Sequence, residues 1–228
     1  MTSVIKTINL SRHFGQGDTL VKALDEVNIT IKKGEFTAII GPSGSGKTTL
    51  LQLIGGLDET SAGNVILDDK NISDMSGQEL SDFRRDHIGF VFQAYNLIPV
   101  LSAKENIEYI MLLQGVSADE RHRRVEHIMA QVGLTGLASR RPTQLSGGQQ
   151  QRVAIARAMV SNPSIILADE PTANLDSRTG MALIDMMKKL NEQEQMTFVF
   201  STHDPKIMES ARRIITLEDG RVVDDFVK

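Results

Sequence analysis

The sequence predicts an α/β protein whose core of strands and helices carries an inserted helical lobe. Three continuous apolar runs are typical of buried parallel strands: Phe36–Ile40, Ile165–Ala168 and Thr197–Ser201. Between the first of these runs and the other two, the pattern turns helical from about Ser102 to Met159. Strands on both sides of a helical block favour one α/β core that is interrupted by an insertion.

The N-terminal part contains mostly short strands. Alternating apolar and polar residues predict strands at Val4–Leu10 and Val27–Ile31, followed by a turn at Lys33-Gly34. The buried run Phe36–Ile40 ends at Gly41, and the helix that follows it is predicted over Lys47–Gly55. Two more strands are predicted at Gly63–Leu67 and Ile88–Phe92, the second closing at Gln93.

The helical block and the C-terminal part follow. The block contains three predicted helices, Ala103–Leu113, Ala118–Val132 and Gly147–Val160, the last after a Ser-Gly-Gly start. A helix over about Arg178–Glu192 separates the two later buried strands. Ile214–Leu217 and Arg221–Asp225 are predicted to form a terminal hairpin around Asp219-Gly220.

Composition excludes several classes of protein. With 228 residues, 40% of them hydrophobic, the chain can form a substantial core. A net charge of −4 argues against a general nucleic-acid binder, and the lack of cysteine excludes disulfides and thiolate metal sites. No signal peptide is recognisable, and no apolar run approaches the roughly 20 residues that cross a bilayer. If the protein acts at a membrane, we expect another chain to cross it.

A glycine-rich turn lies between the strand Phe36–Ile40 and the helix that follows it. The segment Gly41-Pro42-Ser43-Gly44-Ser45-Gly46-Lys47-Thr48, with Thr49 after it, matches the G-x-x-x-x-G-K-[ST] pattern. Its backbone N–H groups and the helix N-terminus suit phosphate oxygens. Lys47 can reach the β- and γ-phosphates, and the Thr48 hydroxyl can ligate Mg²⁺. The alternative is a strand-to-helix turn without function, but both the pattern and its context favour a nucleotide.

Polar side chains end two of the buried strands. Asp169 and Glu170 follow Ile165–Ala168, at the strand end where a parallel sheet presents its ligands. We expect Asp169 to hold Mg²⁺ through its water shell and Glu170 to polarise the attacking water. His203 follows Thr197–Ser201 and can contact the γ-phosphate. The alternatives are a solvated acidic pair and an ordinary surface histidine.

A second glycine-rich helix start lies about a hundred residues further on. Leu145-Ser146-Gly147-Gly148-Gln149 precedes Gln150-Gln151-Arg152 and can offer backbone N–H groups and a hydroxyl to an anion. On the far side of the helical lobe, it is not expected to share a nucleotide with the first turn of its own chain. Two chains arranged head to tail, in a two-fold interface, would bring the two segments together.

Together these segments resemble the ATP-binding subunits of ABC transporters, and the resemblance covers essentially the whole chain. It implies a single ATPase domain over residues 1–228, with a P-loop NTPase (RecA-like) core. An N-terminal antiparallel β subdomain belongs to this core, which comprises residues 1–93 and 161–228. An ABC-specific helical subdomain is inserted at about 94–160. The resemblance further implies ATP and Mg²⁺ as cofactors and a head-to-tail homodimer around ATP.

Three further positions receive roles from the resemblance. Gln93 matches the Q-loop glutamine, which touches Mg²⁺ and the water and links the core to the helical lobe. Ala173-Asn174-Leu175-Asp176 matches the D-loop at the dimer interface, with alanine where glycine is more usual. Phe14 matches an aromatic that stacks on adenine, in place of the commoner tyrosine; its alternative role is a small apolar anchor beside Gly15.

Several stretches are similar to the macrolide-exporter and lipoprotein-releasing branch: Val21–Leu24, Ile54–Asp58, Ile88–Gln93 and Leu167–Asp176. This implies a homodimer that drives a separate membrane permease, with force transmitted across the membrane for export or lipoprotein release. We expect a cytoplasmic protein held on the inner face of the membrane by its permease, with no nucleic-acid partner. Since the chain ends soon after the terminal hairpin, we expect the permease not to be fused to it.

Alternatives remain open at two points. The apolar loop after Gln93, with Tyr95, Leu97, Ile98, Pro99 and Leu101, could receive a permease helix or could pack the lobe onto the core. At the level of function, the alternatives are a soluble ABC-type ATPase, a small-molecule kinase and an ATP-binding scaffold without turnover. The kinase leaves Leu145–Gln149 unexplained, and intact Glu170 and His203 weigh against the scaffold.

Overall fold

The structure is a computed structural model that describes residues 2–228; Met1, the first residue of the predicted core segment 1–93, lies outside the described residues. Within 2–228, six strands form the central sheet in the order β11-β10-β4-β9-β8-β7. Its five neighbouring strands from β10 to β7 are parallel, and β11 is antiparallel to β10. Their bounds are β4 Phe36–Ile40, β7 Ile88–Val91, β8 Ile165–Ala168, β9 Thr197–Ser201, β10 Arg213–Glu218 and β11 Arg221–Val227.

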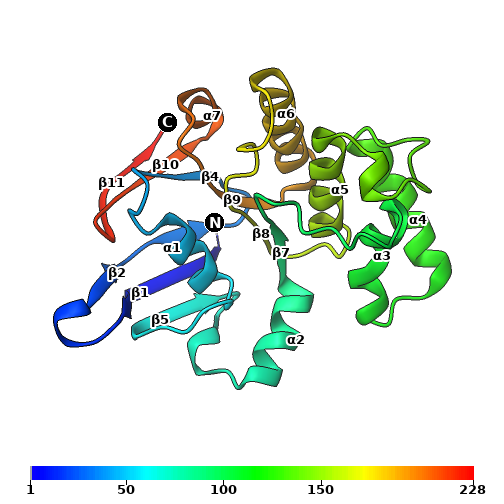
Figure 1. The fold of residues 1–228 in the computed structure, drawn as a ribbon. Coiled ribbons are helices and arrows are strands. Elements are labelled where there is room, and N and C mark those ends of the chain that lie inside the picture. The colour runs from blue at the N-terminus through cyan, green and yellow to red at the C-terminus, as the bar shows by residue number, and fades with distance from the viewer. Residues whose placement is uncertain (1) are drawn as a thin grey trace.

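A second sheet is antiparallel and forms the N-terminal β subdomain (Figure 1). Its long strand β1 (Ser3–Phe14) pairs with β2 (Val21–Val27), β3 (Thr30–Lys32) and β5 (Ala62–Leu67), and β5 also pairs with the short β6 (Lys70–Asn71). The predicted α/β architecture with an antiparallel N-terminal part is therefore confirmed.

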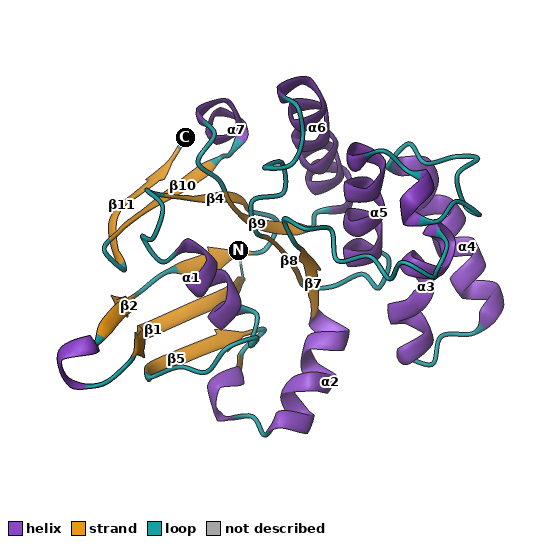
Figure 2. Ribbon diagram, in the orientation of Figure 1, coloured by secondary structure: helices purple, strands orange, loops and turns teal. Residues whose placement is uncertain are grey.

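Helices cover the two sheets and extend to one side of them, as the purple ribbons in Figure 2 show. Their bounds are α1 Lys47–Ile54, α2 Gly77–His87, α3 Ala103–Leu113, α4 Ala118–Gln131, α5 Gly147–Met159, α6 Ser177–Glu194 and α7 Pro205–Ser210, with short 3₁₀ turns at Gly17–Thr19, Ile72–Asp74 and Pro142–Gln144. None of the helices in the described part of the chain is long and apolar enough to span a membrane.

The central sheet separates two hydrophobic clusters, because successive strand residues point to opposite faces. In β9, Phe198 and Phe200 pack with residues of α3 to α7, whereas Val199 packs with α1 and the antiparallel sheet. In β8, Ile166 likewise faces the helices and Leu167 faces α1. Both faces of the sheet are thus buried, which explains the continuous apolar runs in the sequence.

The helical block lies where the sequence predicts it, but its last helix also contacts the core. Helix α5 packs against α3 and also against β7 at the edge of the central sheet. The segment of α5 therefore serves the core as well as the lobe. The boundaries 1–93, 94–160 and 161–228 stay a prediction.

The predicted strand Val27–Ile31 is wrong. β2 already ends at Val27, and β3 begins at Thr30. Between them the Asn28 side chain accepts a hydrogen bond from the Asn9 N–H at 2.8 Å and donates one to the Glu26 carbonyl at 2.8 Å. These local bonds interrupt the strand, as asparagine side chains often do.

Two helices were not predicted. Helix α2 begins with a capping box in which Ser76 and Glu79 exchange hydrogen bonds, a signal that the sequence contains. Helix α7 is short and starts at Pro205. The remaining predicted strands and helices are present, with ends that differ by a few residues.

Candidate nucleotide site

The glycine-rich turn between β4 and α1 curls into left-handed backbone. Gly44 and Gly46 have φ angles of 82° and 101°. A Cβ atom on Gly46 would collide with the carbonyl oxygen of Ala23 and lie 2.8 Å from Cδ2 of Leu24. Only glycine fits this position, which brings the backbone N–H groups of the turn and the N-terminus of α1 together.

The Lys47 ammonium lies inside this turn. It is almost buried and donates hydrogen bonds to the carbonyl oxygens of Gly41 at 2.8 Å and Pro42 at 2.9 Å. Both partners are neutral carbonyl groups, so no carboxylate neutralises the Lys47 charge in these contacts. The positive charge therefore remains available to an anion that enters the turn.

Thr48 and Asp169 meet where α1 faces the end of β8. The Thr48 hydroxyl lies 3.1 Å from both Oδ1 and Oδ2 of Asp169. These two residues are 121 positions apart in the sequence. A hydroxyl and a carboxylate together are hard oxygen donors of the type that Mg²⁺ prefers.

Ser201, the last residue of β9, holds both acidic residues. Its hydroxyl donates to Oδ1 of Asp169 at 2.7 Å and accepts a hydrogen bond from the Glu170 N–H at 2.9 Å. Glu170 itself has a left-handed φ of 45°, a conformation that residues other than glycine seldom adopt. Sequence reasoning did not single out Ser201, although a hydroxyl at the end of a central strand is a recognisable signal.

Glu170 and His203 are also in contact. Oε1 of Glu170 lies 2.9 Å from Nδ1 of His203. The carboxylate is mostly buried, with 16% of its side chain exposed, whereas 71% of the imidazole is exposed. The carboxylate therefore fixes one ring nitrogen and leaves the rest of the ring open to the cleft.

These groups surround one open cleft of about 530 Å³. The structure brings most of the predicted site residues to it: Gly41, Pro42, Ser43, Gly44, Gly46, Lys47, Thr48, Thr49, Gln93, Glu170 and His203. Ala23 and Ala173 also line the cleft and were not predicted to belong to it. Their small side chains leave room beside the turn; the sequence marked them only as parts of the D-loop and of the stretch Val21–Leu24, not as lining of the cleft.

Four predicted positions or segments do not line this cleft. Asp169 contacts the Thr48 hydroxyl but is not itself part of the cleft lining. Ser45 is buried, and its hydroxyl has no hydrogen-bond partner in the described part of the chain. Phe14 is exposed near the end of the β1–β2 hairpin, where the guanidinium of Arg12 lies 4.6 Å from its ring centroid. The segment Ser146–Gln149 belongs to a different part of the surface.

The segment Ser146–Gln149 forms the N-terminus of α5. The Ser146 hydroxyl accepts from the Gln149 N–H, and the Gln149 side chain accepts from the Ser146 N–H at 2.9 Å. Gly147 and Gly148 allow close packing, since a Cβ atom would lie 2.9 Å from the Tyr95 hydroxyl and 2.6 Å from Thr179, respectively. These contacts fix the helix start, which does not line the cleft of its own chain.

Gln93 follows β7 at the edge of the cleft. Its carbonyl oxygen accepts a hydrogen bond from the side-chain amide of Asn174 at 2.8 Å. Asn174 belongs to the segment between Glu170 and α6, whose first turn is capped by Asp176. Hydrogen bonds from Thr179 and Arg178 hold the pKa of the Asp176 carboxyl below its ordinary value.

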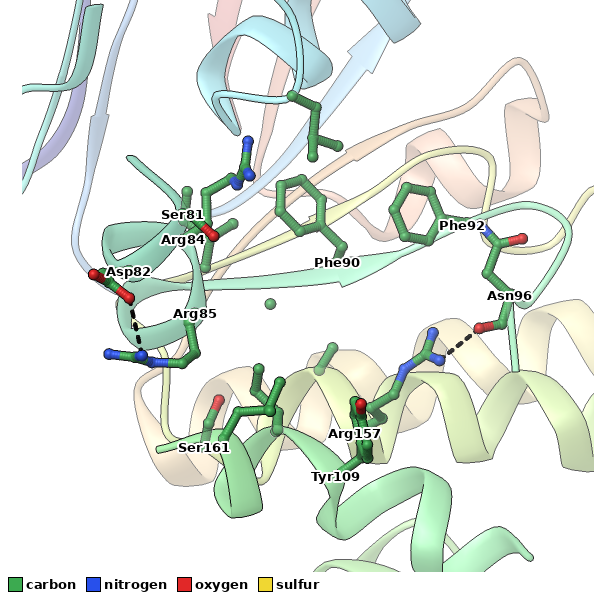
Figure 3. Close-up of a pocket in the computed structure, with 16 residues that line it drawn as sticks. Ser81, Asp82, Arg84, Arg85, Phe90, Phe92, Asn96, Tyr109, Arg157 and Ser161 are labelled. Carbon is green, nitrogen blue, oxygen red and sulfur yellow. Dashed lines mark hydrogen bonds and ion pairs between the residues drawn. The ribbon is translucent and has the colours of Figure 1, made fainter. Parts of the chain in front are cut away.

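A separate apolar groove of about 540 Å³ lies between α2, β7, α3 and α5 (Figure 3). Phe90, Phe92 and Tyr109 lie along it, with Arg84 and Arg85 at one end and Arg157 near Asn96 at the other. None of the apolar loop residues lines the groove, and one of them, Leu97, packs against the hydrophobic core; the loop residues are Tyr95, Leu97, Ile98, Pro99 and Leu101. The loop borders the groove only through Asn96.

Comparison with known proteins identifies the family. The model of the ABC transporter family matches residues 24–173. The ABC transporter ATP-binding protein MJ0796 of Methanocaldococcus jannaschii is 47% identical over 223 residues, which cover 96% of this chain and 95% of that protein. A dimeric structure of MJ0796 matches with a TM-score of 0.90 at 46% identity, over 98% of each chain. Another, in a post-hydrolysis state bound to ADP and phosphate, matches with a TM-score of 0.89 at 45% identity, again over 98% of each chain.

Relatives with a fused permease also match. The macrolide export ATP-binding/permease protein MacB of Mannheimia succiniciproducens is 43% identical over 226 residues. That alignment covers 99% of this chain but 35% of the exporter, so the chain spans about a third of the exporter's length. Since the family model matches most of the chain and MJ0796 matches nearly all of it, the chain belongs to the ABC transporter family, as the ATP-binding cassette that hydrolyses ATP.

Proposed function

We propose that two copies of this chain bind two ATP molecules head to tail and that hydrolysis drives a membrane permease. The observation that carries the proposal is the separation of the two glycine-rich helix starts. The cleft holds Lys47, Glu170 and His203, whereas Ser146–Gln149 lies outside it. A second copy can bring its own Ser146–Gln149 to the open side of the cleft, and the related MJ0796 is known as a dimer.

The cleft suits ATP for reasons that its own residues supply. The N–H groups of the glycine turn and the α1 N-terminus can bind the phosphates. Lys47 can exchange its two carbonyl partners for the β- and γ-phosphate oxygens. Phe14 stays the candidate for stacking on adenine, and its exposed ring supports this role.

Mg²⁺ is the metal that fits this donor set. Within residues 2–228 no three acidic or histidine side chains gather into a complete metal site. The oxygens of Thr48 and Asp169 would hold the ion together with phosphate oxygens, and the Gln93 side chain would complete the set. Bound there, Mg²⁺ would neutralise charge on the phosphates.

Hydrolysis requires a water molecule in line with the γ-phosphate. Glu170 is the group that orients this water and accepts its proton, since its carboxylate lies at the cleft beside His203. His203 contacts the carboxylate through Nδ1, and when the ring carries a proton on both nitrogens its Nε2 can also donate a hydrogen bond to the γ-phosphate. Positioning and charge stabilisation account for most of the rate in phosphoryl transfer.

The apolar groove is the proposed docking site for the permease. Tyr109 and Leu113 in α3 are 42% and 53% exposed there, which is unusual for neighbouring large apolar side chains. The groove lies directly beside the Gln93 loop, so a permease segment in it would be close to the ATP site. The chain would act in the cytoplasm, on the inner face of the membrane, in export or lipoprotein release; the relatives named as macrolide exporters support this direction.

The substitution Glu170→Gln tests the proposal. The variant should bind ATP with nearly unchanged affinity and form a stable dimer, because closure needs the phosphates and hydrolysis needs the carboxylate. Light scattering after size-exclusion chromatography, with ATP and with ADP, measures the dimer. A variant that stays monomeric at saturating ATP, or one that still hydrolyses ATP at the wild-type rate, would refute the proposed roles.

A further inference from the structure

The loop that follows Gln93 has an unusual backbone. Tyr95 and Asn96 have φ angles of 59° and 48°, in the left-handed region that residues other than glycine seldom adopt. Two such residues in succession are costly unless the surroundings hold them. Contacts with the rest of the protein must therefore hold this loop in its conformation.

Arg157, on α5, supplies the contact. Its two terminal nitrogens donate to successive carbonyl oxygens, Nη1 to Asn96 at 2.6 Å and Nη2 to Tyr95 at 3.1 Å. Figure 3 shows the guanidinium pointing from the helix toward the loop at Asn96. The planar fork of arginine fits two neighbouring acceptors, whereas the point charge of lysine does not.

Burying the positive charge of Arg157 costs desolvation energy. Burial lowers the pKa of the guanidinium, and among the described residues no carboxylate forms an ion pair with it. A half-buried cation whose partners are only carbonyl oxygens does not contribute a salt bridge to stability. Its specific effect is on the conformation of the Tyr95–Asn96 backbone.

We propose that Arg157 is a positioning residue for Gln93. On one side, Asn174 holds the Gln93 carbonyl at 2.8 Å; on the other, Arg157 holds the carbonyls of Tyr95 and Asn96, two and three residues further along the chain. The peptide that carries Gln93 is thereby fixed between the D-loop segment and α5. The inference rests on the proposed function, in which the Gln93 side chain faces the nucleotide and Mg²⁺.

The arrangement has a consequence for signalling. Ser146 caps the N-terminus of α5, so the helix that presents the second glycine-rich segment also holds the loop of Gln93. Arg157 lines the apolar groove as well. A segment bound in the groove would therefore meet the side chain that sets the position of Gln93.

A double-mutant cycle tests the inference. Arg157→Gln should lower the kcat of ATP hydrolysis about tenfold with little change in the KM for ATP, since misplacing a group in the site costs this much or more. Arg157→Lys replaces the two terminal nitrogens of the guanidinium with a single ammonium nitrogen, so its kcat should lie between those of Arg157→Gln and the wild type. In a Gln93→Ala background the Arg157→Gln effect on kcat should vanish, because the group that Arg157 positions is gone.

Arg152→Gln is the matched control. Arg152 also lies on α5 and donates to a carbonyl, that of Val132 at 2.8 Å, but this carbonyl belongs to the end of α4. Its effect on kcat should be the same with and without Gln93. An Arg157 effect that persists undiminished in Gln93→Ala would overturn the inference. Where Arg157→Gln lowers the melting temperature strongly, the same comparison is made with Arg157→Lys, and an undiminished effect there overturns it equally.

The results that would refute the proposed function differ from those that would refute the inference about Arg157. Wild-type protein without ATPase activity, or a Glu170→Gln variant with full activity, would refute the roles assigned to the cleft and leave nothing for Arg157 to position. Wild-type activity that depends on Glu170, combined with additive effects of Arg157 and Gln93, would refute only the inference.

Discussion

The hydroxyl of Ser201 at the end of β9 donates a 2.7 Å hydrogen bond to Asp169 at the end of β8. The same oxygen accepts the N–H of Glu170 at 2.9 Å. One buried hydroxyl thus orients the side chain of Asp169, the candidate metal ligand, and holds the backbone N–H of Glu170, the candidate base. The Asp169 side chain and the Glu170 backbone are therefore both tied to the neighbouring strand.

Ser201→Ala should lower kcat roughly 10- to 100-fold, because displacing a catalytic group by up to about one ångström has effects of this size. It should also cost about 1–3 kcal/mol of stability, since the buried Glu170 N–H loses its acceptor. Steady-state ATPase assays and denaturant unfolding measure the two effects. Ser73→Ala is the matched control: its hydroxyl accepts the Val65 N–H at 2.9 Å, outside the cleft, so a similar fall in kcat there would contradict the prediction.

Much of the site could be predicted because it consists of local sequence signals. The glycine turn before Lys47 and the acidic pair at Asp169 and Glu170 each follow a short apolar run that reads as a buried strand. Parallel strands bring their carboxyl ends to one edge of the sheet. The structure accordingly collects Lys47, Glu170 and His203 around one cleft.

The contacts between distant residues could not be predicted. Thr48 and Asp169, 121 residues apart, were both expected near Mg²⁺, but nothing in either segment specifies that they contact each other directly. The Arg157 contact with Asn96 spans 61 positions and depends on left-handed backbone that asparagine permits but does not require. Similarly, the interruption at Asn28 follows from side-chain bonds to Asn9 and Glu26 that alternation of apolar residues cannot reveal.

The glycine turn provides a test of close packing before any nucleotide binds. Gly44→Ala and Gly46→Ala both place a Cβ atom on left-handed backbone, which costs about 1–2 kcal/mol. At Gly44 the new atom meets no atom of the described residues within 4 Å, whereas at Gly46 it collides with the Ala23 carbonyl. Gly46→Ala should therefore lose about 1–3 kcal/mol more than Gly44→Ala in nucleotide-free unfolding. Equal losses would show that the turn relaxes around the added methyl group.

The groove can be tested by introducing a charge. Leu113→Glu places a carboxylate in the apolar groove, where burying it against a permease segment would cost several kcal/mol. Co-purification with the permease should be lost, and the melting temperature should stay close to that of the wild type, because 53% of Leu113 is exposed. Val223→Glu, on β11 and 55% exposed, is the control that should keep the association. Unchanged co-purification of Leu113→Glu would exclude the groove as the docking site.

The cap of α6 predicts a pH dependence of stability. Asp176 accepts hydrogen bonds from the Arg178 and Thr179 N–H groups, and the Thr179 bond is the main cause of its lowered pKa. A carboxyl whose pKa is lower in the folded state stabilises the fold fully above its unfolded pKa, and this contribution is lost as the pH falls through the folded pKa.

Asp176→Asn keeps an oxygen acceptor but does not titrate. The wild type should therefore have a higher melting temperature than Asp176→Asn at neutral pH, and the difference should shrink below about pH 4. Asp185→Asn, in the middle of the same helix and exposed, controls for the loss of one carboxylate. A difference between wild type and Asp176→Asn that stays constant down to pH 3 would show that the ionised cap does not stabilise α6.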